Sequence, residues 1–260
     1  MRPLLVLRRD PGEYTSRRQA APVPDHEGEP MADWKNPFSR ETFAFLRDLR
    51  ENNDRDWFKA NSERYEDVVR EPALQFISDF GTRLDTVSTH FLAVPKKVGG
   101  SLFRIHRDVR FSRDKRPYKT HLGIHFRHKQ HKDAHAPGFY LHIEPGSVFM
   151  GGGMWRPHPE ALRAIRQQIV ADGAGWREVT VDPGLGDSLE LGGESLKRAP
   201  RGFDAAHPRI DDIKRKSFMA VARLNQTRLL SRGFLDEFTG LCAEVSPLMR
   251  FVCRATGVPF

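Results

Sequence analysis

Cysteine is scarce in this sequence: Cys242 and Cys253 are the only two in 260 residues. Two thiols cannot supply a disulfide framework or a four-cysteine zinc site, which excludes the disulfide-rich secreted domains. Both thiols fall on an apolar helical stripe, so we expect buried side chains without chemistry. Because the chain has no apolar leader segment of the secretory kind, the sequence predicts a reducing, cytoplasmic compartment.

Long apolar runs are also absent. The longest run near the N-terminus spans Leu4 to Leu7, far short of the roughly 18 to 20 apolar residues that a membrane span needs. Apolar residues nevertheless make up 38% of the chain and charged residues 29%, a balance typical of chains that bury a sizeable core. The composition therefore excludes a disordered chain and predicts a soluble protein with no membrane partner.

The common catalytic motifs are missing as well. The sequence contains no GxGxxG or GxxxxGK(S/T) phosphate loop, no GxSxG nucleophile turn and no HExxH metal motif. Gly151-Gly152-Gly153 follows a predicted strand, but five residues separate it from the helix that begins at Pro159, which disfavours a phosphate loop. We expect these glycines to serve close backbone packing or a β-bulge.

Positive charge is what the sequence has in excess, and it is concentrated in one segment. The whole chain has a net charge of +8, whereas residues 96–132 carry 12 Lys or Arg against two Asp, a net +10 that leaves −2 for the rest. Such a segment is typical of a solvated surface hairpin or of a site for an anionic partner. The same segment holds five histidines: His106, His121, His125, His128 and His131.

Apolar periodicity predicts helices on both sides of a central region. Ser39 and Asp54 are expected to cap two N-terminal helices, and Pro72 to begin a third. Residues 182–206 are predicted to be irregular. Further helices are predicted over 159–171, 208–216 and 233–254, the last interrupted at Pro247.

In the central region the apolar period changes to two. Strands are predicted over 101–111, 120–127, 138–144, 147–151 and 217–223, with Pro145-Gly146 as one connecting turn. Strands joined by turns and flanked by helices predict an α+β fold with N-terminal helices, a central antiparallel sheet and C-terminal helices. Residues 1–30 have no apolar period and predict a disordered tail, which leaves 31–260 as a single domain.

The first predicted strand carries the candidate binding site. In an extended segment, Phe103, Ile105, Val109 and Phe111 would face the core, while Arg104, His106, Asp108 and Arg110 would share the opposite face. Arg107 interrupts the apolar series, which indicates a β-bulge or a buried, paired arginine. Guanidinium forks bind phosphate or carboxylate in bidentate fashion. We therefore predict that the ligand is bound by Arg104, Arg107, Arg110, Lys115 and Lys119.

Catalytic candidates lie in the same hairpin. Asp108 or His106 would act as base and Tyr118 as acid, because they would stand beside arginines that fix an anion. The structural alternative is a salt network of Arg, Lys and Asp that pins the hairpin, with Tyr118 packed beneath it.

A longer pattern covers this hairpin: Arg104-x-x-Arg107-Asp108-x-Arg110-Phe111-x-x-x-Asp114-Lys115-x-x-Tyr118. It resembles the signature of a bacterial family of conserved hypothetical proteins, the domain of unknown function 2461 family. All eight defining positions are present in order, and the resemblance covers about residues 34 to 254. It implies membership of an uncharacterised family and assigns no reaction, cofactor or catalytic role.

The histidines of this region are candidate metal ligands. His121 and His125 lie four residues apart on one strand, about 13 Å, which is too far for both to bind one ion. His142 could partner His125 from the neighbouring strand, but no Asp or Glu joins them at zinc-motif spacing, and the positive segment would repel a dication. The sequence therefore predicts no metal site, and the cofactor is left unknown.

Taken together, these patterns predict that the basic hairpin binds a phosphate-bearing small molecule, with a nucleotide as one candidate. The first alternative is non-specific nucleic-acid binding, which a local charge of +10 would support by counterion release. It is less favoured because Phe103 and Phe111 are predicted in the core, which leaves Tyr118 as the main exposed aromatic for base stacking. The second alternative is an interaction protein in which the cluster is a structural salt network. Whether the protein is an enzyme is left open.

Overall fold

An antiparallel sheet forms the centre of the computed structural model, which describes residues 34–131, 135–181 and 184–260. Its strand order in this part of the chain is β1-β2-β3-β5-β4, and Pro145-Gly146 joins β2 to β3, where Gly146 has a φ of +84° that suits glycine. The strands predicted within 120–151 and at 217–223 are confirmed. The bounds are β1 (Leu122–Arg127), β2 (Gly138–Glu144), β3 (Ser147–Met154), β4 (Glu190–Gly192) and β5 (Phe218–Leu224).

Helices precede and follow the first three strands. The side chains of Ser39 and Asp54 accept hydrogen bonds from backbone N–H groups in the first turns of α1 and α2, which confirms both predicted caps. Together with the antiparallel sheet, these helices confirm the α+β fold class. The N-terminal helices are α1 (Arg40–Glu51), α2 (Arg55–Ala60), α3 (Ser62–Tyr65), a π-helical turn (Glu66–Arg70) and α4 (Glu71–Val87). The later ones are α5 (Pro159–Ala171), α6 (Gly173–Thr180), α7 (Ile210–Ile213), α8 (Gln226–Leu229), α9 (Phe234–Glu244) and α10 (Ser246–Ala255).

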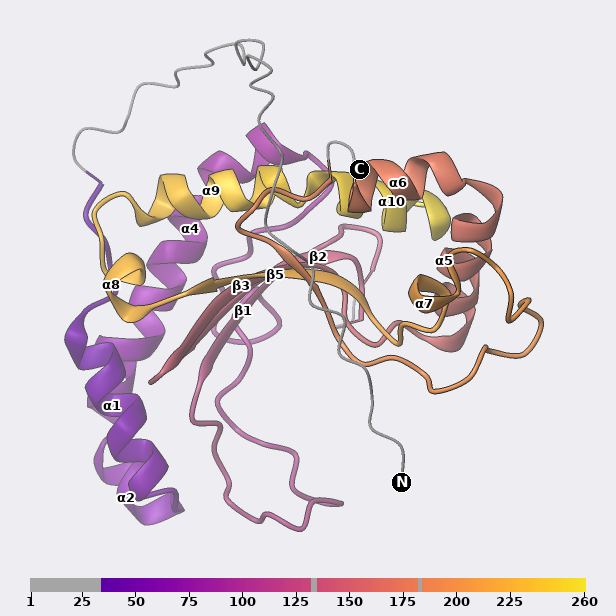
Figure 1. Cartoon of the computed structure of the whole chain (residues 1–260). Helices are drawn as coiled ribbons and strands as arrows, with labels where there is room; N and C mark the ends of the chain where they lie inside the picture. Colours follow the sequence, from indigo (N-terminus) through magenta and orange to yellow (C-terminus); the bar gives the residue numbers. More distant parts are fainter. Residues whose placement is uncertain (1–33, 132–134, 182–183) are drawn as a thin grey trace, which may run out of the picture. The chain divides into compact units, whose positions relative to one another are not determined.

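The helices cover one face of the sheet. In Figure 1, α9 and α10 run along the top of the sheet, and residues 101–119 extend from its other side. Phe126 of β1 packs edge-on against Phe80 of α4, with ring centroids 4.6 Å apart, and Phe80 packs against Phe238 of α9 at 4.8 Å. Aromatic pairs of this kind contribute about 0.5–1.5 kcal/mol each beyond their buried area. This aromatic cluster holds the two helices onto the sheet.

Strand alternation assigns the remaining residues to the opposite face. Ile124 and Phe126 are fully buried on the helix-covered face, so Gly123, His125 and the residues aligned with them point the other way. On β2 the same alternation sends Tyr140, His142 and Glu144 to that second face. The second face is therefore polar and aromatic, and it carries the site described below.

The predicted strand over 101–111 is wrong. This stretch makes only isolated bridges, Leu102 to Ile124 and His106 to Tyr118, and Phe111, expected in the core, is 96% exposed. The reason is local: the Asp108 side chain accepts a hydrogen bond from the backbone N–H of Arg110, 3.2 Å away. Such side-chain-to-backbone bonds compete with a strand ladder and favour turns.

Residues 34–260 form one compact unit. The predicted tail, 1–30, lies outside the described residues, and the single domain over 31–260 remains a prediction. Within the part of the chain that the structure describes, no helix has the length and apolar character to cross a membrane. The predicted burial of both thiols is confirmed, since Cys242 and Cys253 are 0% and 1% exposed.

Candidate functional site

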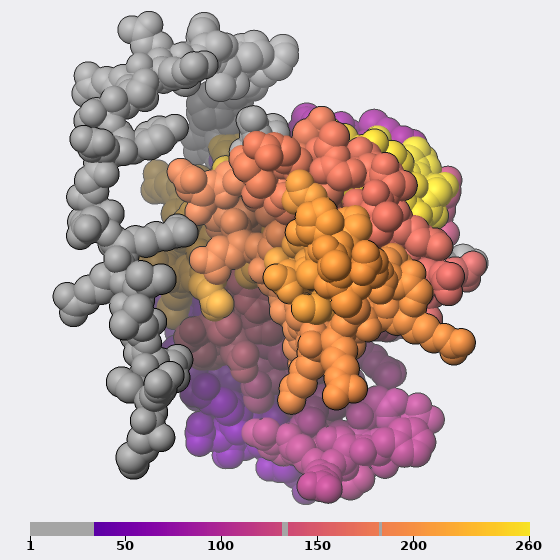
Figure 2. All heavy atoms as spheres, turned by 45° about the vertical axis from the view of Figure 1, so that its right-hand side comes forward, coloured from indigo at the N-terminus to yellow at the C-terminus, as the bar shows by residue number. Residues whose placement is uncertain are grey.

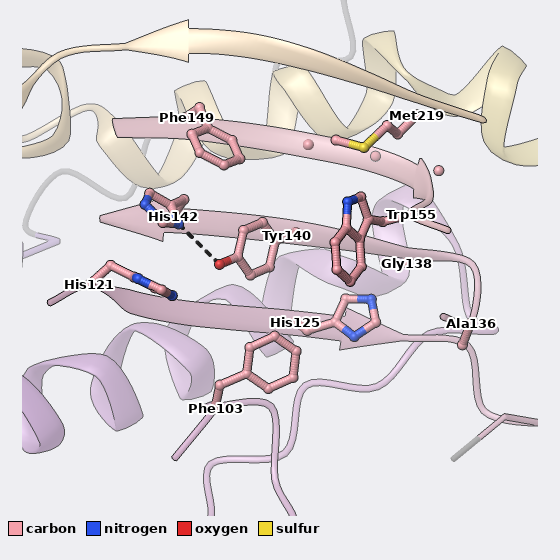
Figure 3. A pocket seen from close by; sticks show the side chains of 13 residues that line it. Phe103, His121, His125, Ala136, Gly138, Tyr140, His142, Phe149, Trp155 and Met219 are labelled. Carbon is pink, nitrogen blue, oxygen red and sulfur yellow. Dashed lines mark hydrogen bonds between the residues drawn. The ribbon is translucent and has the colours of Figure 1, made fainter. Parts of the chain in front are cut away.

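A pocket of about 410 Å³ lies on the second face of the sheet, and we call it the sheet-face pocket. Its volume falls in the range of about 300–1,000 Å³ that is usual for small-molecule sites. Aromatic rings and imidazoles form its walls (Figure 3). These are Phe103, His121, His125, Tyr140, His142, Phe149 and Trp155.

Glycines form the floor of this pocket. A Cβ on Gly152 would lie 2.5 Å from Cγ1 of Val245, so the tight approach of the junction between α9 and α10 requires glycine there. Gly153 has a φ of +128°, and its Cβ would lie 2.2 Å from the carbonyl oxygen of Phe218. A Cβ on Gly151 would instead make ordinary contacts at 3.7 Å. Close packing thus explains two of the three glycines, as predicted, and the missing side chain of Gly151 leaves the pocket hollow.

Two further glycines let side chains lie flat on the sheet. Gly123 is paired with His142 across β1 and β2, and a Cβ on it would lie 2.7 Å from the hydroxyl of Tyr140. A Cβ on Gly138 would lie 2.2 Å from Nε2 of His125. The bare backbone at these positions makes room for Tyr140 and His125 inside the pocket.

A hydrogen-bonded row of polar side chains follows β2. The hydroxyl of Tyr140 lies 3.1 Å from Nδ1 of His142, and Nε2 of His142 lies 3.4 Å from Oε2 of Glu144. The other carboxylate oxygen of Glu144 accepts a hydrogen bond of 2.9 Å from the hydroxyl of Thr120. Figure 3 shows the Tyr140 hydroxyl turned toward His142, at the end of the pocket where His121 also lies. The row joins a phenol, an imidazole and a carboxylate, which are groups that can transfer protons.

Burial sets the charge of these groups. Burial, and after it the nearby His142, lowers the pKa of His121 to about 4, although the charge of Glu144 acts in the opposite direction. Burial also lowers the pKa of His142, although its hydrogen bond to Glu144 acts in the opposite direction. The pKa of Tyr140 is raised, mainly by burial and then by the charge of Glu144. At neutral pH this end of the pocket therefore holds two neutral imidazoles, those of His121 and His142, 4.5 Å apart between ring centroids, and the protonated phenol of Tyr140.

The predicted arginines lie in the hairpin beside the pocket, and most of them pair with aspartates. Arg107 forms an ion pair of 2.7 Å with Asp114, and Arg110 forms one of 2.7 Å with Asp108. Arg116 forms a third, 2.8 Å from Asp114. The hydrogen bonds from Arg110 lower the pKa of Asp108 to about 2. In Figure 2 this hairpin is the magenta lobe that projects at the bottom of the molecule.

The catalytic candidates of the hairpin do not line the sheet-face pocket. Tyr118 is 6% exposed and stacks on Phe58 with 4.1 Å between ring centroids, and its backbone exchanges two hydrogen bonds with Asn53. His106 lies against the same Tyr118 ring, at 5.2 Å. Asp108 is already paired with Arg110. These contacts favour the structural alternative for Tyr118, while the catalytic assignments stay predictions.

The two predicted lysines differ in position. Lys115 donates a hydrogen bond of 3.0 Å to the carbonyl of Val109 and so closes the hairpin tip. Lys119 donates one of 2.9 Å to the carbonyl of Arg104, and its ammonium lies 5.4 Å from the centre of the Phe103 ring. Burial and then the charge of Arg104 lower the pKa of Lys119. Because Phe103 is a wall of the pocket, Lys119 brings the basic hairpin to the pocket rim.

The row Tyr140-x-His142-x-Glu144 is not among the site residues predicted from the sequence, although the alternating pattern that places it on one face is visible there. The three residues alternate along the predicted strand 138–144, so they had to share a face. Glu144 is the carboxylate that joins the histidines, and the partner of His142 is His121 instead of His125. The spacings of zinc motifs do not include Glu144, because His121 precedes β1 whereas His142 and Glu144 belong to β2.

The comparisons with known proteins add a family and no activity. A family model described as conserved hypothetical protein (DUF2461) matches residues 41–251. The match includes the whole of the motif between Arg104 and Tyr118 as well as β1, β2 and β3. No curated protein matches the chain.

Proposed function

The chain belongs to the DUF2461 family of conserved hypothetical proteins, and on that premise we propose that it binds a phosphate-bearing small molecule. The organic part of the ligand occupies the sheet-face pocket, and its phosphate lies at the rim, near Lys119 and Arg104. The family description names no reaction, so the support comes from the geometry of this site.

The walls of the pocket support a ligand with a flat ring. Phe103 and Tyr140 lie 6.1 Å apart between ring centroids, and Tyr140 and Phe149 lie 5.9 Å apart. Rings at these spacings pack against one another, and an aromatic face that such a cluster leaves open toward the pocket can stack on a planar group such as a nucleobase. The hydroxyl of Tyr140 and the imidazole of His142 supply hydrogen bonds that fix the orientation of such a ring.

The observation that carries the proposal is the contact between Lys119 and Phe103, 5.4 Å from the ammonium to the ring centre. It puts a cation of the hairpin against a wall of the pocket. Arg104 forms no ion pair within the described part of the chain, unlike Arg107 and Arg110, and its charge lowers the pKa of Lys119. Two cations that are not neutralised by aspartate thus lie close together near the rim, which is what a phosphate requires.

Thermal unfolding with a ligand panel tests this proposal. The panel contains nucleoside monophosphates, the matching uncharged nucleosides and inorganic phosphate. A ligand present at about 100 times its Kd stabilises the folded state by about 2.7 kcal/mol, which raises the melting temperature of a chain of this size by about 5–10 °C. We expect at least one monophosphate to give such a shift and its nucleoside to give a smaller one.

Two variants with the same charge change sharpen the test. Lys119→Gln removes the rim cation, whereas Lys96→Gln removes an exposed lysine of the same basic segment. We expect the shift to disappear in the first variant and to persist in the second. Equal loss in both variants would mean that overall charge attracts phosphate without a site, and the absence of any shift in the wild type would refute the proposal.

A further inference from the structure

We propose that His121, His142 and Glu144 bind one divalent first-row transition-metal ion, such as Zn²⁺ or Fe²⁺, at one end of the sheet-face pocket. One ligand atom from each residue lies within 4.8 Å of the other two. The sheet register explains this convergence. Leu122 pairs with Ile143, so the preceding His121 stands opposite Glu144, with His142 on its diagonal. The proposal concerns the same pocket as the proposed function and shares His142 with it, but it uses none of Lys119, Arg104 and Phe103.

The present distances are close to those of a bound ion. Bonds of about 2.0–2.1 Å in tetrahedral geometry place the ligand atoms about 3.3–3.5 Å apart. Nε2 of His142 and Oε2 of Glu144 are already 3.4 Å apart. The imidazole of His121 is the group that has to move, by at most about 1.5 Å, and its side chain is only partly buried. A rotation of this one side chain would therefore complete the set.

The neighbours of the three ligands are those expected around a metal. Ligating histidines commonly hydrogen-bond through their second nitrogen, and ligating carboxylates are commonly held by a further donor. Nδ1 of His142 faces the Tyr140 hydroxyl, and Thr120 holds the Oε1 atom of Glu144, which leaves Oε2 for the ion. If a metal ion bound Nε2 of His142, the neutral imidazole would carry its proton on Nδ1, and that N–H would donate a hydrogen bond to the Tyr140 oxygen. The phenol proton then points into the pocket, available to a bound ligand.

The donor set indicates the class of ion. Two imidazoles and one carboxylate suit Zn²⁺, Fe²⁺ and their first-row neighbours, whereas Mg²⁺ and Ca²⁺ prefer oxygen ligands. Three protein ligands leave at least one coordination position free, and His121 and His142 both line the pocket. A dication with one carboxylate keeps a net charge of +1, so the free position favours an anionic ligand atom.

Metal titration of the purified full chain tests the proposal. The protein is first stripped with a chelator, and Zn²⁺ and Co²⁺ are added while bound metal is counted by elemental analysis and Co²⁺ by its visible absorption. We expect about one ion per chain in the wild type. His142→Ala and Glu144→Gln should weaken binding by at least 100-fold, and Thr120→Val, which removes the hydrogen bond to Glu144, by about 10–100-fold. His106→Ala removes a histidine of the hairpin outside the set and should leave metal binding unchanged.

The outcomes separate this proposal from the previous one. Glu144→Gln keeps the size of the side chain, and an unchanged melting temperature of the metal-free variant shows that it is folded. The absence of stoichiometric binding in the wild type, or equal binding by wild type and Glu144→Gln, would overturn the metal site. Phosphate ligands are then tested on chelator-treated protein. Stabilisation that persists there supports the pocket on its own, so either proposal can fail without the other.

Discussion

The three consecutive glycines of β3 should respond differently to the same substitution. Gly151→Ala adds a methyl group with ordinary contacts at 3.7 Å, so we expect unchanged stability or a gain of about 0.5–1 kcal/mol from the lower entropy of the unfolded chain. Gly152→Ala brings a methyl group within 2.5 Å of Val245, an overpacking that costs about 1–3 kcal/mol. Gly153→Ala combines backbone strain at a φ of +128° with a clash against Phe218, and together these should lower the free energy of unfolding by about 2–6 kcal/mol.

Urea denaturation of the three variants measures these free energies of unfolding, and the ligand panel described above measures binding. Gly151→Ala should be as stable as the wild type and yet show a reduced ligand shift, because its methyl group enters the pocket. Gly151→Val should reduce the shift further. Gly240→Ala is the matched control, since a Cβ there has no atom within 4 Å and Gly240 lies outside the pocket.

Two results would refute this reasoning. A loss of stability at Gly151 as large as that at Gly153 would show that packing requires glycine at all three positions. A full ligand shift in Gly151→Val would show that the ligand is not bound above this part of the sheet.

Three other predictions follow from the hairpin and the thiols. Arg110→Ala and Asp108→Asn should each lower the melting temperature at pH 7 only slightly, because the Arg110 side chain is 77% exposed and solvent screens the pair. The wild type has this small stabilisation above pH 4 and loses it as the pH falls toward the Asp108 pKa of about 2, so a melting temperature that falls as steeply with acid in Asp108→Asn would contradict this role of the pair. Cys253, whose pKa burial raises to about 12, should resist a thiol reagent at pH 8 until the protein unfolds, and rapid labelling of the native chain would contradict its burial. If all five predicted cations contacted phosphates of duplex DNA, a plot of log binding constant against log salt concentration would have a slope near −4 to −5. Because Arg107 and Arg110 are paired with aspartates, we expect no such slope, and a slope of that size would favour nucleic-acid binding.

The regular elements could be predicted because each depends on a pattern within its own residues. The helix over 159–171 and the strand over 138–144 have the bounds that periodicity predicts. The segment 101–111 is not a strand, although apolar and polar residues alternate along most of it. The Asp108 side chain accepts a hydrogen bond from the backbone N–H two residues later, as the Asp114 side chain does in the turn that follows the segment. An alternating pattern cannot tell a strand from a series of turns when Asp side chains compete for the backbone.

The site could be predicted only in part, because its members meet across strands. His142 is paired with Gly123, so it is diagonal to both His121 and His125, and the sequence gives no preference between them. Tyr140 separates His142 from His125. Tyr140 is paired with His125 across the strands, and its hydroxyl lies within hydrogen-bond distance of Nδ1 of His142. The His142 ring lies against His121, with ring centroids 4.5 Å apart. The basic hairpin was predicted as the whole site, whereas the structure joins it to a pocket that no local pattern reveals.

The most direct test of the central claim is a crystal structure of the protein with a phosphate compound that raises its melting temperature. We predict electron density for the compound in the sheet-face pocket, with the organic ring among Phe103, Tyr140 and Phe149 and above Gly151. The phosphate should lie within hydrogen-bond distance of Lys119. Density for the compound on the hairpin surface alone, at Arg107 or Arg110, with the pocket filled only by water, would contradict it.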